Sequence, residues 1–179
     1  MHKFKDDDQT ALDKCEEALL VIRDVNFDMG QRLQIQTTDL LAAMDDIDGA
    51  ILCAKNVLQE DRQRRGSEEE MALDGVILKM IGILHSQQKK LDLAEEELTK
   101  ALEITTRFGS ETHMEVAQIL NSLGSVHGVA GDRQKVHDFF QLALIVEQIY
   151  AEDDNDPQIL HILWNLATLS GEKVPKWEG

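Results

Sequence analysis

Apolar residues recur every three or four positions along most of this chain, and they nowhere alternate with polar residues as in a half-buried strand. This spacing gathers the apolar side chains on one face of a helix. The pattern predicts eight helices, over residues 7–25, 31–44, 47–62, 69–87, 91–108, 115–129, 133–150 and 157–169. The chain is therefore predicted to be all-α.

Short polar segments separate the predicted helices. Ser67-x-x-Glu70 and Thr112-x-x-Glu115 have the spacing of a capping box, in which a hydroxyl and a carboxylate satisfy the free amides of a helix start. Asp45-Asp46 forms the bend between the second and third helices, and Gly131 follows an apolar run, as a left-handed residue that ends a helix does. Connections this short make consecutive helices antiparallel neighbours.

Two stretches of the chain match each other at a shift of 42 residues. The matching pairs are Ile81 and Leu123, Gly82 and Gly124, His85 and His127, Leu98 and Phe140, and Ala101 and Ala143. A fixed period of this size is typical of stacked helical units rather than of one closed globule. The small residues in the pattern allow neighbouring helices to approach closely.

The order of large and small residues within each stretch resembles the tetratricopeptide repeat. From Ala117, the family's large positions hold Leu120 and Leu123, and its first small position holds Gly124. The stretch that starts at Gly75 follows the same order, whereas an earlier pair matches less well and the last helix resembles half a unit. The resemblance covers about residues 31–170 and implies a right-handed α-solenoid of antiparallel helix pairs.

The connecting segments look like those of kinesin light chain repeats. Gly109-x-x-x-His113-x-x-Val116-Ala117 and Asp154-x-Asp156-Pro157-x-Ile159 carry this likeness, and the second helices are about eight residues longer than in the usual repeat. The resemblance implies an N-terminal helix over residues 1–30 (a cap or the second half of a preceding repeat), repeats over 31–172 and a tail over 173–179.

In this family the first helix of each unit lines a concave groove that binds peptides. Carried onto the matching positions, the resemblance implies a partner-binding surface made of Arg32, Gln36, Asp39, Lys79, Met80, Ile83, Gln118, Asn121, Ser122, Ser125, His161, Trp164, Asn165 and Thr168. Carboxamide side chains can hold a peptide backbone through paired donors and acceptors, and Trp164 can supply a buried anchor. The alternative is that these side chains only solvate the inner wall. A chaperone-type clamp for a terminal carboxylate is disfavoured, because only Lys79 and Asn121 match the basic and amide residues that such a clamp uses.

The net charge and the cysteine content limit which partners and which cellular compartment are expected. The formal net charge of −16 argues against nucleic acid and against anionic membrane surfaces. No segment approaches the roughly 20 apolar residues of a membrane span, and the first residues do not form a signal peptide. Cys15 and Cys53 lie at apolar helix positions and do not make a disulfide framework. The expected location is an intracellular reducing compartment, the cytoplasm first, or an organellar matrix if a targeting segment was removed.

No signature of catalysis, cofactor binding or metal binding is present. The chain lacks a nucleophile elbow, a phosphate loop, a His-Glu-x-x-His motif and a dinucleotide fingerprint. The segment 46–49 lacks the ligand spacing of a calcium loop, and His85 and His127 are interpreted as packed imidazoles. We therefore predict a non-enzymatic protein without catalytic, cofactor or metal residues.

The function that this sequence favours is an adaptor or scaffold that binds a segment of a protein or peptide partner. Two alternatives remain at this stage. One is a structural module that forms homo-oligomers through its terminal helices, since such ends expose apolar faces. The other is a regulatory domain of a larger protein.

Overall fold

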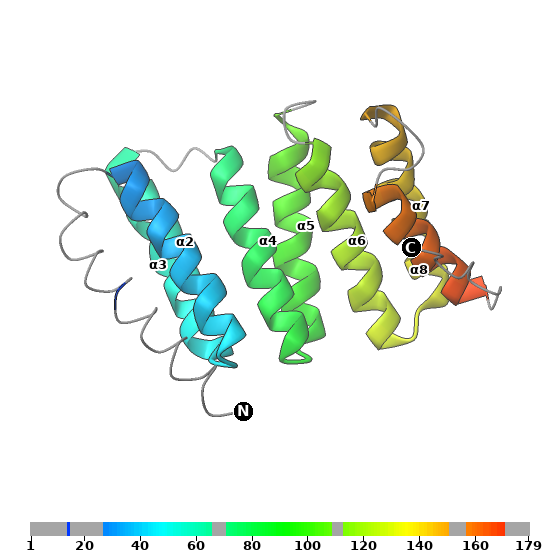
Figure 1. The fold of residues 1–179 in the computed structure, drawn as a ribbon, viewed down its shortest axis with the longest axis horizontal. Helices are drawn as coiled ribbons and strands as arrows, with labels where there is room; N and C mark the ends of the chain where they lie inside the picture. Colours follow the sequence, from blue (N-terminus) through cyan, green and yellow to red (C-terminus); the bar gives the residue numbers. More distant parts are fainter. Residues whose placement is uncertain (1–13, 15–26, 66–70, 109–112, 151–156, 171–179) are drawn as a thin grey trace. The chain divides into compact units, whose positions relative to one another are not determined.

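The computed structural model describes Lys14 and residues 27–65, 71–108, 113–150 and 157–170, and every regular element in these ranges is an α-helix (Figure 1). The helices are α2 (Phe27–Ala43), α3 (Ile47–Arg65), α4 (Ala72–Gln87), α5 (Leu91–Thr106), α6 (His113–Ala130), α7 (Arg133–Tyr150) and α8 (Pro157–Ser170). The prediction of an all-α fold is confirmed. None of the described helices is long and apolar enough to cross a membrane.

Several helix ends differ from the sequence-based expectation by a few residues. Helix α2 begins at Phe27 rather than at residue 31, and Gly30 lies inside the helix. Helix α4 begins at Ala72 rather than at residue 69, and α6 begins at His113 rather than at residue 115. Apart from Lys14, the helix expected over residues 7–25 lies outside the described residues, as do the capping residues Ser67, Glu70 and Thr112.

The chain divides into two compact units, Met1–Glu70 with Gln87–Lys89, and Met71–Ser86 with Lys90–Gly179. In the first unit α2 and α3 pack as an antiparallel pair. Ala50, Ala54 and Val57 of α3 are buried there. Cys53 is half-buried, and its thiol donates to the carbonyl oxygen of Gln34 at 3.5 Å.

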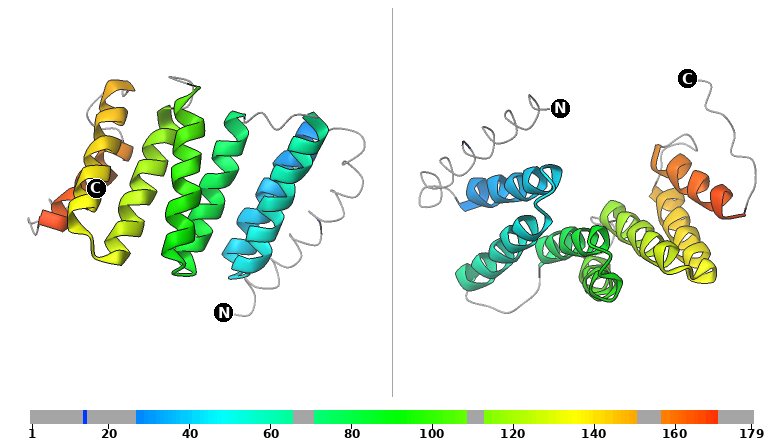
Figure 2. Two further views of the ribbon diagram at one scale, coloured as in Figure 1. Left: turned by 180° about the vertical axis from the view of Figure 1, so that it is seen from behind. Right: turned by 90° about the horizontal axis from the view of Figure 1, so that it is seen from below.

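In the second unit α4 to α8 follow one another in chain order, each antiparallel to the next (Figures 1 and 2). The first helices of its pairs are α4, α6 and α8, and the second helices are α5 and α7. Ile162 of α8 joins the buried cluster formed by Leu120 of α6 and by Val136, Phe140 and Ala143 of α7. The last helix is thereby fixed to the preceding pair.

The two glycines of the repeat lie in matching surroundings. A Cβ added at Gly82 would lie 2.7 Å from Cγ of Leu98 and 3.2 Å from the carbonyl oxygen of Ala94. A Cβ added at Gly124 would lie 2.6 Å from Cε1 of Phe140. At 2.6–2.7 Å an added Cβ would displace Leu98 or Phe140, so each pair of helices is in close contact at its glycine.

The histidines that match between repeats are packed, as expected. His85 and His127 are buried. The imidazole of His127 stacks on Phe139 with 5.4 Å between ring centroids, and its Nε2 lies 3.3 Å from Oε1 of Glu95.

The turns inside the three helix pairs adopt the same backbone conformation. Asp45, Lys89 and Gly131 have positive φ angles of 67°, 59° and 84°. In each turn the amide of the residue after the positive-φ position donates to the carbonyl oxygen five residues earlier, for example from Lys90 to His85 at 3.0 Å. This is the Schellman arrangement, which satisfies carbonyls at a helix end. The left-handed role predicted for Gly131 is confirmed, and the same conformation occurs at two residues that carry a side chain.

The residue after each left-handed position begins the next helix, and it differs between the pairs. The carboxylates of Asp46 and Asp132 accept hydrogen bonds from the amides of Gly49 at 3.0 Å and Lys135 at 3.1 Å. Lys90 occupies the matching place before α5 and makes no side-chain cap. The start of α5 therefore lacks an interaction that α3 and α7 possess.

Replacing Lys90 with aspartate is expected to stabilise the protein by about 1 kcal/mol, because the new carboxylate would accept the uncapped amides at the start of α5. A negative charge at a helix N-terminus is also favoured by the helix dipole. Urea denaturation followed by circular dichroism measures the change. The reverse change, Asp132→Ala, is the matched control and is expected to cost about the same amount. An unchanged midpoint for Lys90→Asp would contradict the capping argument.

Candidate functional site

Helix α6 carries a stripe of polar side chains on one face. Its opposite face buries Leu120, Leu123 and Gly124 against α7, so residues three and four apart on the remaining face form a continuous row. The row consists of Gln118, Asn121, Ser122 and Ser125. Matching faces of α4 and α8 carry the other predicted residues of the second unit.

Hydrogen bonds join these faces across the three first helices. Nζ of Lys79 on α4 donates to Oε1 of Gln118 on α6 at 2.6 Å. Nδ2 of Asn165 on α8 donates to Oδ1 of Asn121 on α6 at 3.1 Å. These four half-buried residues, here called the polar ladder, connect side chains that lie 39 and 44 residues apart in the sequence.

Lys79 is the cation of the polar ladder. Burial lowers the pKa of its ammonium group, because the charged form loses water, and the nearby Glu115 carboxylate opposes this effect. The hydrogen bond to Gln118 partly replaces the lost hydration. Lys79 is thus held in a fixed position rather than extended into solvent.

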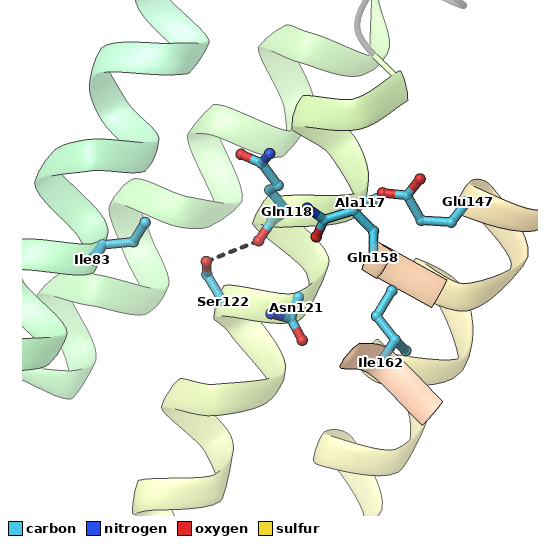
Figure 3. Close-up of a pocket in the computed structure, with 8 residues that line it drawn as sticks. All are labelled: Ile83, Ala117, Gln118, Asn121, Ser122, Glu147, Gln158 and Ile162. Atoms are coloured by element: carbon cyan, nitrogen blue, oxygen red, sulfur yellow. Dashed lines mark hydrogen bonds between the residues drawn. The ribbon is translucent and has the colours of Figure 1, made fainter. Parts of the chain in front are cut away.

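A pocket of about 190 Å³ lies beside the polar ladder (Figure 3). Four helices of the second unit contribute its lining, which consists of Ile83 of α4, Ala117, Gln118, Asn121 and Ser122 of α6, Glu147 of α7, and Gln158 and Ile162 of α8. The hydroxyl of Ser122 donates to the carbonyl oxygen of Gln118 at 2.8 Å, so its oxygen remains available as an acceptor. The pocket combines apolar walls with a set of polar groups.

The structure brings part of the predicted surface together. Gln118 and Asn121 line the pocket, and Lys79 and Asn165 bond to these two. Met80 is half-buried on α4, and four predicted residues of the second unit are exposed without lining the pocket, namely Ser125, His161, Trp164 and Thr168. Arg32 and Gln36 are exposed on α2 of the first unit. Their role in binding stays a prediction from the sequence.

Sequence reasoning missed Glu147 and Gln158 of the pocket. Glu147 is on a second helix, and the resemblance assigned binding residues only to first helices. A signal was present, because Asp61, Thr105 and Glu147 occupy matching places in three successive second helices and all are buried polar residues. Gln158 lies one residue after the proline that starts α8, in a segment interpreted only as a helix start.

Residues 75–144 match the family model of the tetratricopeptide repeat. Among solved structures, BtubC (BKLC) from P. vanneervenii matches with a TM-score of 0.77 and 22% identity, over 92% of this chain and 66% of that chain. Two structures of a kinesin-light-chain-like protein from Podosopora anserina, with nearly identical TPR-like repeats, match with TM-scores of 0.71 and 0.70. Each is 12% identical over 95% of this chain, and the match covers 81% and 82% of those chains. No curated protein matches the chain in sequence. Identities this low show a common fold alone.

Proposed function

We propose that this chain, whose residues 75–144 match the tetratricopeptide repeat model and whose fold is similar to that of a kinesin-light-chain-like protein, is an adaptor or scaffold that binds a segment of a partner protein along α4, α6 and α8. The observation that carries the proposal is the polar ladder, which links the three first helices through Lys79–Gln118 and Asn121–Asn165 bonds. The proposed role is binding and not catalysis.

The polar ladder suits a peptide backbone, which presents amide donors and carbonyl acceptors at regular intervals. Each carboxamide has two N–H donors and two acceptor lone pairs, and the bonds within the ladder use one group on each residue. Because these bonds fix the side chains before a partner arrives, less conformational entropy is lost on binding.

Trp164 is a candidate apolar contact on α8, the helix that also carries Asn165 of the polar ladder. Its side chain is 44% exposed, and it precedes Asn165 on α8. Tryptophan is enriched among the residues that dominate binding energy at interfaces. A partner residue that covers this ring would add hydrophobic burial to the hydrogen bonds of the ladder.

Selection from a random dodecapeptide display library tests the proposal. The double variant Asn121→Ala/Asn165→Ala is expected to weaken a selected peptide about tenfold, because two hydrogen bonds of about 0.5–1.5 kcal/mol each are lost. Isothermal titration calorimetry with the synthetic peptide measures the change in Kd.

The control is Asn56→Ala, which removes an exposed carboxamide from α3. This variant is expected to leave peptide affinity unchanged. The proposal fails if no peptide is selected, or if the ladder variant and the control bind the peptide equally well.

A second candidate, self-assembly of the chain, has one specific observation in its favour, which concerns α7 and not the terminal helices. Helix α7 exposes three large apolar side chains where the matching places in and just after α5 carry charged residues: Leu142, Ile145 and Ile149 against Lys100, Glu103 and Arg107. A second copy of the chain could cover this stripe. Light scattering over a range of concentrations, with Ile145→Glu as the variant, distinguishes a self-assembling protein from a monomeric adaptor.

A further inference from the structure

We propose that copies of this chain join head to tail, with residues 7–25 of one copy packing as a second helix against α8 of the next copy. The contact would complete the helix pair that α8 begins. The inference goes beyond the proposed function, because the partner is a second copy of the same chain and the contact uses a different face of α8 from the polar ladder.

Helix α8 contains no charged residue. It alone among the described helices lacks Asp, Glu, Lys and Arg, although 29% of the residues of the chain are charged. It nevertheless exposes Leu163 at 42% and Trp164 at 44%. The last helix of a repeat array normally presents a polar outer face, because an uncovered apolar face limits solubility. The composition of α8 is therefore typical of a helix that another helix covers.

Leu163 lies on the side of α8 where a second helix packs in the other pairs. Places in α6 and α8 match at a shift of 43 residues. Ile162 is buried, as is Ile119 at the matching place, and it packs into the cluster of the preceding pair. Leu163 matches Leu120, which is only 5% exposed because α7 covers it. The described residues contain no helix after α8 that could cover Leu163 in the same way.

The described second helices bury side chains at one common spacing, in which the later residues follow the first by four, seven and eleven positions. The sets are Ala50, Ala54, Val57 and Asp61 of α3, Ala94, Leu98, Ala101 and Thr105 of α5, and Val136, Phe140, Ala143 and Glu147 of α7. The predicted helix over residues 7–25 has the same spacing, at Ala11, Cys15, Ala18 and Ile22. Lys14 in this segment is helical. Residues 7–25 therefore carry the sequence pattern of a second helix.

The segment and α8 match each other in the register of the existing pairs. The three residues of α7 that match Ala11, Cys15 and Ala18 form a buried cluster with Leu120. Leu120 is in turn the residue that matches Leu163. A helix over residues 7–25, packed on α8 in this register, would therefore cover Leu163. Because α8 carries no charge, the acidic residues of the segment meet no like charge on it.

A second copy suits this contact better than the same chain does. Residues 7–25 are followed directly by α2, and helices joined by so short a connection are neighbours. In a solenoid each unit contacts only the next one, so a contact within one chain would require the first and last helices to meet and close a ring. A contact between copies continues the order of first helix and second helix. Such a heterologous contact leaves a free site at each end and permits further growth.

The proposed contact leaves the polar ladder accessible. Leu163 and Asn165 are two residues apart in α8, which corresponds to about 200° around a helix. Self-association and the binding of a partner segment therefore use different faces of α8.

Sedimentation equilibrium over a range of concentrations tests the proposal. One helix packed on another is at the small end of interface sizes, so the full chain is expected to associate weakly, with a mean mass that rises with concentration. Leu163→Glu should abolish this rise. Leu93→Glu, the same change at a similarly exposed leucine of α5, should leave it unchanged. Ile145→Glu should also leave it unchanged, which separates this contact from one through α7.

A mixture of variants tests the head-to-tail arrangement. Ala18→Glu should abolish growth, as Leu163→Glu does. An equimolar mixture of the two variants should form dimers and nothing larger, because each variant keeps the end that the other lacks.

A cross-link gives a second test that does not depend on the folding of Ala18→Glu. Mild oxidation of Leu163→Cys is expected to give dimers joined between the introduced thiol and Cys15 of another copy, as mapped by mass spectrometry. Leu163→Cys/Cys15→Ser should lack this link. A mass of one chain at all concentrations, equal association of Leu163→Glu and Leu93→Glu, or dimers joined only through Cys53 would overturn the inference.

Discussion

Replacing Leu98 with alanine is expected to lower the free energy of unfolding by about 2–5 kcal/mol. Leu98 is fully buried in α5, and its side chain fills the space that Gly82 leaves on α4. The substitution removes apolar contacts and leaves a cavity that the rigid helix pair can close only in part. Urea denaturation followed by circular dichroism at 222 nm gives the change in stability, and a constant m value shows that the unfolding transition is comparable.

Leu93→Ala on the same helix is the matched control. The Leu93 side chain is 44% exposed, so its removal is expected to have a small effect. A loss at Leu98 no larger than the loss at Leu93 would mean that the contact between α4 and α5 does not hold the repeat together.

Gly82→Ala and Gly124→Ala are each expected to cost about 1–3 kcal/mol, although alanine favours a helix more than glycine does. The added methyl group would overlap Leu98 in the first case and the ring of Phe140 in the second. Thermal and urea denaturation measure both variants.

Gly128→Ala provides a control within the same helix as Gly124. A Cβ at Gly128 meets only Cγ2 of Val136, at 3.8 Å, which is an ordinary contact. This variant is expected to gain up to about 1 kcal/mol from helix propensity. The same chemical change should therefore have opposite signs at the two glycines of α6. Destabilisation at Gly128, or none at Gly124, would contradict the close approach of the helices.

A double variant separates steric overlap from other causes. Leu98→Ala creates space next to Gly82, so Gly82→Ala should cost less in that background than in the wild-type protein. The two residues are in contact, and their effects are expected to be non-additive by about 0.5–3 kcal/mol. Additive losses would mean that the glycine matters for a reason other than the contact with Leu98.

The sequence sufficed to predict helix pairs, because the pattern of small and large residues records which backbones come close. Gly82 and Gly124 identify the contacts, and the 42-residue shift identifies the repeating unit. The helix ends were less predictable. Asp45 and Lys89 end their helices in the left-handed conformation without being glycine, since the Schellman bonds compensate for the strain of a side chain at positive φ.

Individual residues of the candidate site could be chosen from the sequence, but the contacts between them could not. The resemblance to the repeat assigned Asn121 and Asn165 to first helices, but the hydrogen bond between them depends on the register between α6 and α8. Glu147 was missed for the same reason, because its approach to the pocket depends on how α7 packs against its neighbours. Such registers arise from tertiary packing, which a single sequence does not state.

The packing position that both repeat units share is a glycine on the first helix, which has a hydrogen atom in place of a side chain. Leu98 packs into the space beside Gly82, and Phe140 packs into the equivalent space beside Gly124. The residue that fills this space can therefore differ in size while the glycine is kept. Selection on the packing therefore acts on few positions and leaves the solvent-facing row of each first helix open to substitution. A scaffold built in this way can acquire a new binding preference without rebuilding its interior.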